Sequence, residues 1–91
     1  NRNWNVMIIS SKTPHVDLHG ERESKVEVLV NDFINENILL HNDVVVIIHG
    51  KSTNILTKEV HKVLSNNKQI KKYYLDNWNL GQTIVELKDN L

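Results

Sequence analysis

The stretch from Asp43 to Asn54 constrains the fold more than any other part of the chain. Val44 to Ile48 are five consecutive β-branched apolar residues. Such a run predicts a strand that is buried on both faces, as in a parallel or mixed sheet covered by helices. The strand is followed by a polar turn and then by helix-capping residues. Open α/β sheets bind their ligands at turns of this kind, so the stretch predicts a ligand site.

The other elements follow from hydrophobic periodicity and turn residues. Val16 to His19 predicts a second short strand, and Gly20 permits the turn out of it. Apolar residues at helical spacing predict helices from Glu21 to about Leu40 and from Thr53 to Ser65. Strands are predicted at 70–75 and 83–87 with a loop at 76–82 between them, and Asn42 is expected to take a left-handed cap after the first helix.

These elements occur in the order β-α-β-α-β-β. Two parallel strands joined through a helix make a right-handed crossover, so the first two strands are expected to be parallel. The predicted fold class is α/β, a two-layer sandwich made of a four-stranded mixed sheet and two helices. Parallel strands end at the same edge of a sheet, so the two polar turns that follow them are expected to lie close together.

The chain of 91 residues has the length of one small domain. We expect residues 1–15 to be an N-terminal extension or a linker from a preceding domain, with a strand over Trp4 to Ile9, and residues 16–91 to be the folded domain. A first residue other than Met suggests a piece of a longer protein. The absence of cysteine excludes disulfides and thiolate metal sites and suits a cytoplasmic protein, and the sequence contains neither a bilayer-spanning run nor a signal-peptide pattern.

Opposite charges gather in different parts of a chain whose net charge is zero. Residues 17–43 hold seven acidic and two basic residues, whereas residues 51–74 hold six lysines and one acidic residue. This asymmetry predicts a basic end suited to phosphate and an acidic end that faces elsewhere. The alternative is that these charges are ordinary solvated helix faces.

Three motifs occur in a fixed order along the chain. They are Val16-Asp-Leu-His-Gly20, then Val45-Val-Ile-Ile-His-Gly-Lys51, and finally Gly81-Gln-Thr-Ile-Val-Glu-Leu87, separated by helices of fitting length. Together they resemble the small MutS-related (Smr) domain over about residues 16–88. That family has a D-L-[HR]-G motif, an H-G-x-G-x-G motif and a closing Gly-x-Thr-x-Val strand.

The resemblance implies nucleic-acid binding and, in many members, endonuclease activity. Such domains are often found at the C-terminus of bacterial MutS paralogues, and their targets include branched DNA and messenger RNA on stalled ribosomes. The predicted function is therefore cleavage of phosphodiester bonds in structured DNA or ribosome-associated RNA with little sequence specificity, in ribosome rescue or DNA repair. The expected partners are nucleic acid and the ribosome, with no membrane. The isolated domain is expected to be a monomer and the parent protein a dimer.

Phosphodiester cleavage needs a base, an acid and positive charge for the transition state. Histidines can fill either proton-transfer role near neutral pH. Asp17, His19 and His49 are therefore the predicted catalytic residues. Contacts with nucleic acid are expected from a larger set, which holds Lys51, Ser52, Thr53, Asn54, Lys58, Lys62, Lys71 and Lys72.

Other arrangements would leave these residues without a catalytic role. Asp17 would then cap the following helix while His19 forms a hydrogen bond across the sheet. Lys51 would then be a surface residue in an ordinary strand-to-helix turn. No protein metal site is predicted, although a divalent cation such as Mg²⁺ is a compatible cofactor.

The remaining aromatic residues and histidines carry weaker expectations. His61 is expected on the surface, beside the basic face of the second helix. One of Tyr73 and Tyr74 should face the core while the other is free to stack on a base. Trp78 is expected to pack against the edge of the sheet.

The sequence departs from the family pattern inside the second motif. Ser52 and Asn54 stand where the family usually has glycines, and Thr57 stands where an Arg often follows the Leu. Asn tolerates a left-handed conformation better than Ser does. These departures motivate an alternative function: a non-catalytic module that docks a larger MutS-like protein on nucleic acid or on a ribosome.

Overall fold

The run Val44–Ile48 forms strand β2 in the interior of a four-stranded sheet of order β1-β2-β4-β3. In this computed structural model, which describes residues 9–51 and 54–88, β1 (His15–Asp17) is parallel to β2. β4 (Asn79–Leu87) is antiparallel to both β2 and β3 (Ile70–Asp76). The predicted mixed sheet and its parallel first pair of strands are confirmed.

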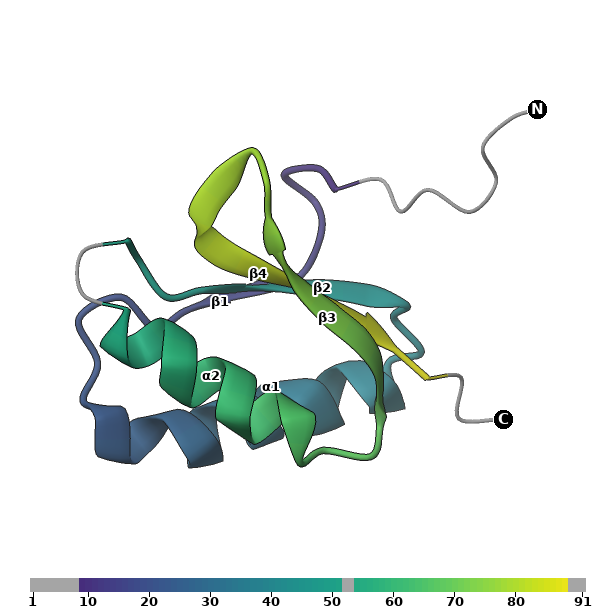
Figure 1. The fold of residues 1–91 in the computed structure, drawn as a ribbon. Coiled ribbons are helices and arrows are strands. Elements are labelled where there is room, and N and C mark those ends of the chain that lie inside the picture. Colours follow the sequence, from purple (N-terminus) through teal and green to yellow (C-terminus); the bar gives the residue numbers. More distant parts are fainter. Residues whose placement is uncertain (1–8, 52–53, 89–91) are drawn as a thin grey trace.

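Two helices lie side by side across one face of the sheet (Figure 1). They are α1 (Val26–Leu39) and α2 (Ile55–Ser65). The core between helices and sheet is built from aliphatic side chains of both layers, among them Leu18, Val30, Ile34, Val45, Ile47, Val60, Leu64 and Val85. The predicted two-layer α/β sandwich is confirmed. No helix in the described part of the chain has the length and apolar character to cross a membrane.

Both described helices cover the same face of the sheet (Figure 1), yet β2 is buried on both faces, as the unbroken apolar run predicts. Val46 is only 4% exposed, and its cross-strand partner Ile84 is 7% exposed. Ile9, Ser10, Ser11 and Thr13 line a pocket together with Val46. Residues before β1 therefore approach the face opposite the helices. The strand predicted over Trp4 to Ile9 lies, apart from Ile9, outside the described residues.

The first helix begins later and ends differently from the prediction. A 3₁₀ turn (Glu23–Lys25) precedes α1, which starts at Val26 rather than at residue 21. At the other end His41, with a φ of 60°, takes the left-handed position that was expected of Asn42. The N–H of His41 bonds to the carbonyl of Ile38 and that of Asn42 to the carbonyl of Asn37, which is a Schellman motif. The motif requires left-handed backbone at its first residue after the cap, and that residue is His41.

β3 and β4 form a hairpin with a two-residue turn, so the loop predicted at 76–82 is wrong. Asp76 pairs with Asn79, and the turn consists of Asn77 and Trp78. The side chain of Asp76 stabilises the turn, because its Oδ1 accepts the backbone N–H of Trp78 (2.9 Å) and its Oδ2 accepts Nε2–H of Gln82 (2.8 Å). Trp78 was expected to pack on the edge of the sheet, but its side chain is 96% exposed, so this expectation is wrong.

The two tyrosines of β3 point to opposite faces of the sheet, as alternation predicts. Tyr73 packs against the core and Tyr74 lies on the surface. The hydroxyl of Tyr74 donates to Oε2 of Glu86 (3.1 Å), and the same oxygen lies 3.7 Å from Nζ of Lys72. Burial, and then the contact with Glu86, raise the pKa of Tyr74.

Candidate functional site

The carboxyl end of β1 presents Asp17 and His19 on the surface while Leu18 between them is buried in the core. This alternation was predicted and is confirmed. Oδ1 of Asp17 accepts the backbone N–H of His19 (2.9 Å), so the carboxylate closes a turn at the end of the strand. Asp17 therefore fixes the backbone that carries the His19 ring.

Gly50, which follows the carboxyl end of β2, lies next to the His19 ring. Gly50 has a φ of +86°, and a Cβ on it would lie 2.9 Å from Cδ2 of the His19 ring. Carbon atoms pack at about 3.5–4.0 Å, so a side chain here would displace the ring. Gly50 thus meets two requirements at once, a left-handed turn and close contact with the candidate catalytic histidine.

The first residues of β4 hold this turn in place. The backbone N–H groups of His49 and Gly50 both donate to the carbonyl of Gly81 (2.9 Å each). These two amides are therefore committed to the hairpin rather than to a phosphate. A Cβ on Gly81 would lie 3.3 Å from Cγ of Lys51, so the aliphatic part of the Lys51 side chain packs on Gly81.

A surface pocket of about 480 Å³ lies where these elements meet. It is lined by four residues of the two His-Gly motifs, by the last residue of β2 and by two residues of β4. These are Asp17, His19, Gly50 and Lys51, then Ile48, and then Asn79 and Gly81. His19 and Gly50 also line a second pocket of about 290 Å³, which extends to Asn54 and the first residues of α2. The N-terminus of α2 favours an anion here, whereas Glu21 and Glu23, which also line this second pocket, oppose one. The 480 Å³ pocket, which contains Lys51, is therefore the better candidate for a phosphate group.

His49, the third predicted catalytic residue, does not line the 480 Å³ pocket, but it lines the 290 Å³ pocket together with His19. His49 is buried, with 4% of its surface exposed. Nε2 lies 2.8 Å from Oγ1 of Thr83, and Nδ1 lies 2.9 Å from Oγ1 of Thr57 and 3.0 Å from the carbonyl oxygen of Gly50. Both ring nitrogens thus have partners within the protein.

His61 is half-buried and bonds to the same threonine as His49, so the expectation that it joins the basic surface is wrong. Its Nε2 lies 2.8 Å from Oγ1 of Thr83, and its ring packs edge-on against Tyr73. Burial, and then the charge of His49, lower the pKa of His61. The sequence did contain a signal for this placement: Thr57 and His61 are one helical turn apart and so share a face of α2.

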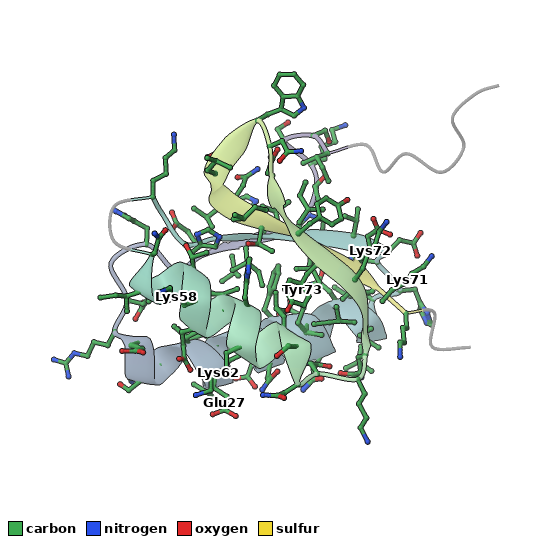
Figure 2. All side chains as sticks on the ribbon, viewed as in Figure 1. Glu27, Lys58, Lys62, Lys71, Lys72 and Tyr73 are labelled. Carbon is green, nitrogen blue, oxygen red and sulfur yellow. The ribbon has the colours of Figure 1, made fainter. Side chains whose placement is uncertain are left out.

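The lysines predicted to bind nucleic acid do not form one patch. Lys58 lies in the first turn of α2, at the end of the molecule where β2 leads into that helix, whereas Lys71 and Lys72 lie at the opposite end (Figure 2). Lys62 lines a groove of about 400 Å³ between the two helices, together with Glu27 and Glu59. The basic segment of the sequence is therefore distributed over two ends and a groove.

One of the two positions where the second motif lacks a glycine can be compared with the expectation. Asn54 has a φ of 65°, a conformation that Asn tolerates, as was expected for this position. Ser52 and Thr53 lie outside the described residues. Thr57 turns its hydroxyl inward to His49, where the family pattern often places an Arg. Among the described residues that line the 480 Å³ pocket, Lys51 is the one permanent positive charge.

Comparison with known proteins places the chain in a family. The family model of the Smr domain matches residues 16–88. Among curated proteins, the chain is 37% identical over 82 residues to endonuclease MutS2 of Halothermothrix orenii and 36% identical over 87 residues to that of a Geobacillus species. These matches cover 87% and 88% of this chain but 10% and 11% of the relatives. The chain spans about a tenth of the length of the relatives it matches.

Two solved structures share the fold. The crystal structure of the Smr domain of Thermus thermophilus MutS2 superposes with a TM-score of 0.80 at 23% identity, over 84% of this chain and 99% of that one. YdaL, a stand-alone small MutS-related protein from Escherichia coli, gives 0.78 at 22% identity, over 86% of this chain and 69% of that one. Together with the match of the family model over residues 16–88, these likenesses show that the chain belongs to the Smr domain family.

Proposed function

We propose that this Smr domain is an endonuclease domain that cleaves phosphodiester bonds in structured DNA or ribosome-associated RNA with little sequence specificity. The observation that carries the proposal is the pocket where Asp17, His19 and Lys51 meet at the carboxyl ends of two parallel strands. A surface histidine beside a carboxylate and an ammonium group offers the proton transfer and the positive charge that such cleavage needs.

Each side chain has a distinct role in this proposal. His19 transfers a proton at one of its ring nitrogens, as a base toward the attacking oxygen or as an acid toward the leaving oxygen. Asp17 holds the backbone of His19 through the N–H it accepts. Lys51, whose Cγ lies next to Gly81, binds a phosphate oxygen and stabilises the charge of the transition state.

The residues of the pocket do not by themselves form a metal cage. Asp17 is the one carboxylate among the described residues of the lining, and no group of three His, Cys, Asp or Glu residues gathers in the part of the chain that the structure describes. Mg²⁺ is usually held by one or two carboxylates together with substrate phosphates. A divalent cation would therefore depend on the nucleic acid for most of its ligands, and the roles above involve the protein's own groups.

A second candidate function is a non-catalytic module that docks its parent protein on nucleic acid or on a ribosome. Its support is the low positive charge of the 480 Å³ pocket, where Lys51 is the one Lys or Arg among the described lining residues. The family often has an Arg at the position that Thr57 occupies here. For either function we propose a cytoplasmic setting and a monomeric isolated domain.

The test is a cleavage assay with the 91-residue chain on branched DNA and on a structured RNA, with and without Mg²⁺. We expect cleavage that falls by about 100-fold or more in His19→Asn, since general acid–base catalysis contributes at least that much. His41→Asn is the matched control, because His41 is an exposed histidine in a turn after α1.

Three outcomes separate the two functions. Cleavage that His19→Asn removes and His41→Asn spares supports the nuclease. Salt-dependent binding without cleavage under any metal condition supports the docking module. Full cleavage by His19→Asn would contradict the proposed site.

A further inference from the structure

Four side chains, two of them buried and two half-buried, form a hydrogen-bonded cluster next to the pocket of Asp17 and His19. They are Thr57 and His61 from α2, His49 after β2, and Thr83 from β4. Thr83 is fully buried and His49 nearly so. Polar groups are expensive to bury and are retained where they are satisfied, so a cluster of this kind fixes one geometry.

The hydrogen bonds of the cluster run in one direction. The carbonyl oxygen of Gly50 can only accept, so Nδ1 of His49, 3.0 Å away, carries a proton. In neutral His49 the other nitrogen, Nε2, is then bare and accepts the single hydroxyl proton of Thr83. The oxygen of Thr83 in turn accepts Nε2–H of His61. The order of donation is therefore His61, Thr83, His49 and finally the Gly50 carbonyl.

The cluster ends at Gly50, the residue against which the His19 ring packs. Its last acceptor belongs to Gly50, and the α-carbon of Gly50 faces Cδ2 of the His19 ring. The hydroxyl of Thr57, 2.9 Å from Nδ1 of His49, shares the same proton and further restricts that ring. The orientation of Gly50 thus depends on a histidine whose own two nitrogens are already in use.

We infer that His49 is a positioning residue, which through the Thr57–Thr83–His61 cluster holds Gly50 and so orients the His19 ring, rather than a proton-transfer group as the sequence suggests. The inference rests on the proposed function for its consequence in catalysis. Burial is the largest cause that lowers the pKa of His61, and it favours the neutral ring that the donor order requires.

The first experiment is independent of any activity. Ring ¹⁵N–¹H correlation spectra of the full chain, recorded at mildly alkaline pH where free histidine is neutral, report which nitrogen carries the proton. We expect His49 as the Nδ1–H form and His61 as the Nε2–H form. His49 in the Nε2–H form, or as a mixture of both forms, would overturn the inference.

The second experiment asks whether the cluster acts on His19. Thr83→Val keeps the shape of the buried side chain and removes its hydroxyl, and Thr57→Val does the same at a less buried position if the first variant folds poorly. Either substitution should shift the ring signals of His19, although neither side chain lines the pocket of Asp17 and His19. Thr13→Val is the control. Unchanged His19 signals in both cluster variants would contradict the inference.

The third experiment compares two histidines in the cleavage assay. In His49→Asn, the amide can donate to the Gly50 carbonyl in place of Nδ1, but the bond to Thr83 is lost. The cleavage rate should therefore fall by about tenfold, the equivalent of one neutral hydrogen bond, with its pH profile unchanged. In His19→Asn the cleavage rate should fall by about 100-fold or more, and one limb of its pH profile should change. Equal losses with equally altered profiles would make His49 a proton-transfer group. If the native chain cleaves nothing, the nuclease proposal fails while the spectra still decide the positioning role.

Discussion

At the scale of single residues, the contact between Gly50 and His19 links the two His-Gly motifs of the chain. The motifs are about thirty positions apart, and the parallel pairing of β1 with β2 brings them together. Register pairs Asp17 with Ile48, so the residues that follow each strand meet at one edge of the sheet. This meeting was predictable from the sequence, because it follows from the right-handed crossover alone.

Gly50→Ala tests this contact. The substitution places a left-handed conformation on a residue with a Cβ, and that Cβ would enter the space of the His19 ring. We expect a loss of about 1–3 kcal/mol in the free energy of unfolding and a clear drop in cleavage. Urea unfolding and the cleavage assay measure the two effects.

Gly20→Ala is the matched control for Gly50→Ala. Gly20 also has a positive φ, of 87°, but a Cβ there would have no neighbour within 4 Å. Gly20→Ala should therefore lower the free energy of unfolding through backbone strain alone, without displacing His19. Equal cleavage losses in the two variants would contradict the proposed contact.

Residue-scale inferences were weakest for the histidines. The sequence placed His61 on the surface because Lys58 and Lys62 flank it on the same helix. The structure turns it inward because Thr83 on β4 offers a buried hydroxyl 22 positions away. The spacing of Thr57 and His61 places both on one face of α2, but a hydrogen bond between distant elements leaves no periodic signal, so their contacts with His49 and Thr83 were not predictable.

At the scale of elements, the β3–β4 hairpin differs most from expectation. Two-residue hairpin turns are normally recognised by Asn-Gly or a similar pair with positive φ. Here neither Asn77 nor Trp78 has a positive φ, and the pairing is irregular between Leu75 and Asp76. The Asp76 carboxylate stabilises the turn instead, and without a glycine signal the hairpin looked like a loop.

Trp78→Ala tests the geometry of the hairpin. A side chain that is 96% exposed has little packing to lose, so the free energy of unfolding should change by less than about 0.5 kcal/mol. Tyr73→Ala, on the adjoining strand but packed against the core, should cost more than about 2 kcal/mol. Chemical denaturation of both variants gives the comparison. A large loss in Trp78→Ala would mean that the indole packs on the sheet.

At the scale of the whole molecule, the fold was more predictable than the placement of charge. An unbroken β-branched strand, two amphipathic helices and two polar turns sufficed for the architecture. Charge runs in a sequence do not specify direction in space, and the structure sends Lys58 to one end and Lys71 and Lys72 to the other (Figure 2). Lys72 also pairs with Glu86, which further reduces its attraction for phosphate.

Stability should depend on pH through His61. Its pKa is lowered in the folded state from the ordinary value of 6.5, so the unfolded chain binds the proton more tightly. The contribution of His61 is therefore fully present above pH 6.5 and is lost as pH falls from there through the lowered pKa. Urea unfolding between about pH 7 and 5, above the range where most carboxylates titrate, should show this loss.

His61→Gln separates this effect from other titrations. Gln retains an N–H that can reach Thr83 but has no proton to gain in this range. The variant should lose less stability on acidification than the native chain, whereas His15→Gln, at an exposed position, should behave like the native chain. Parallel pH profiles for the native chain and His61→Gln would show that the buried ring does not resist protonation.

Nucleic acid should bind at the edge where β1 and β2 end. Backbone amide spectra recorded while a branched DNA or an RNA stem-loop is added to the chain locate the binding surface. We expect the largest shifts at residues 17–20 and at Gly50 and Lys51. Shifts concentrated at residues 70–72, with residues 17–20 unchanged, would place the interface at the opposite end of the sheet and contradict this expectation.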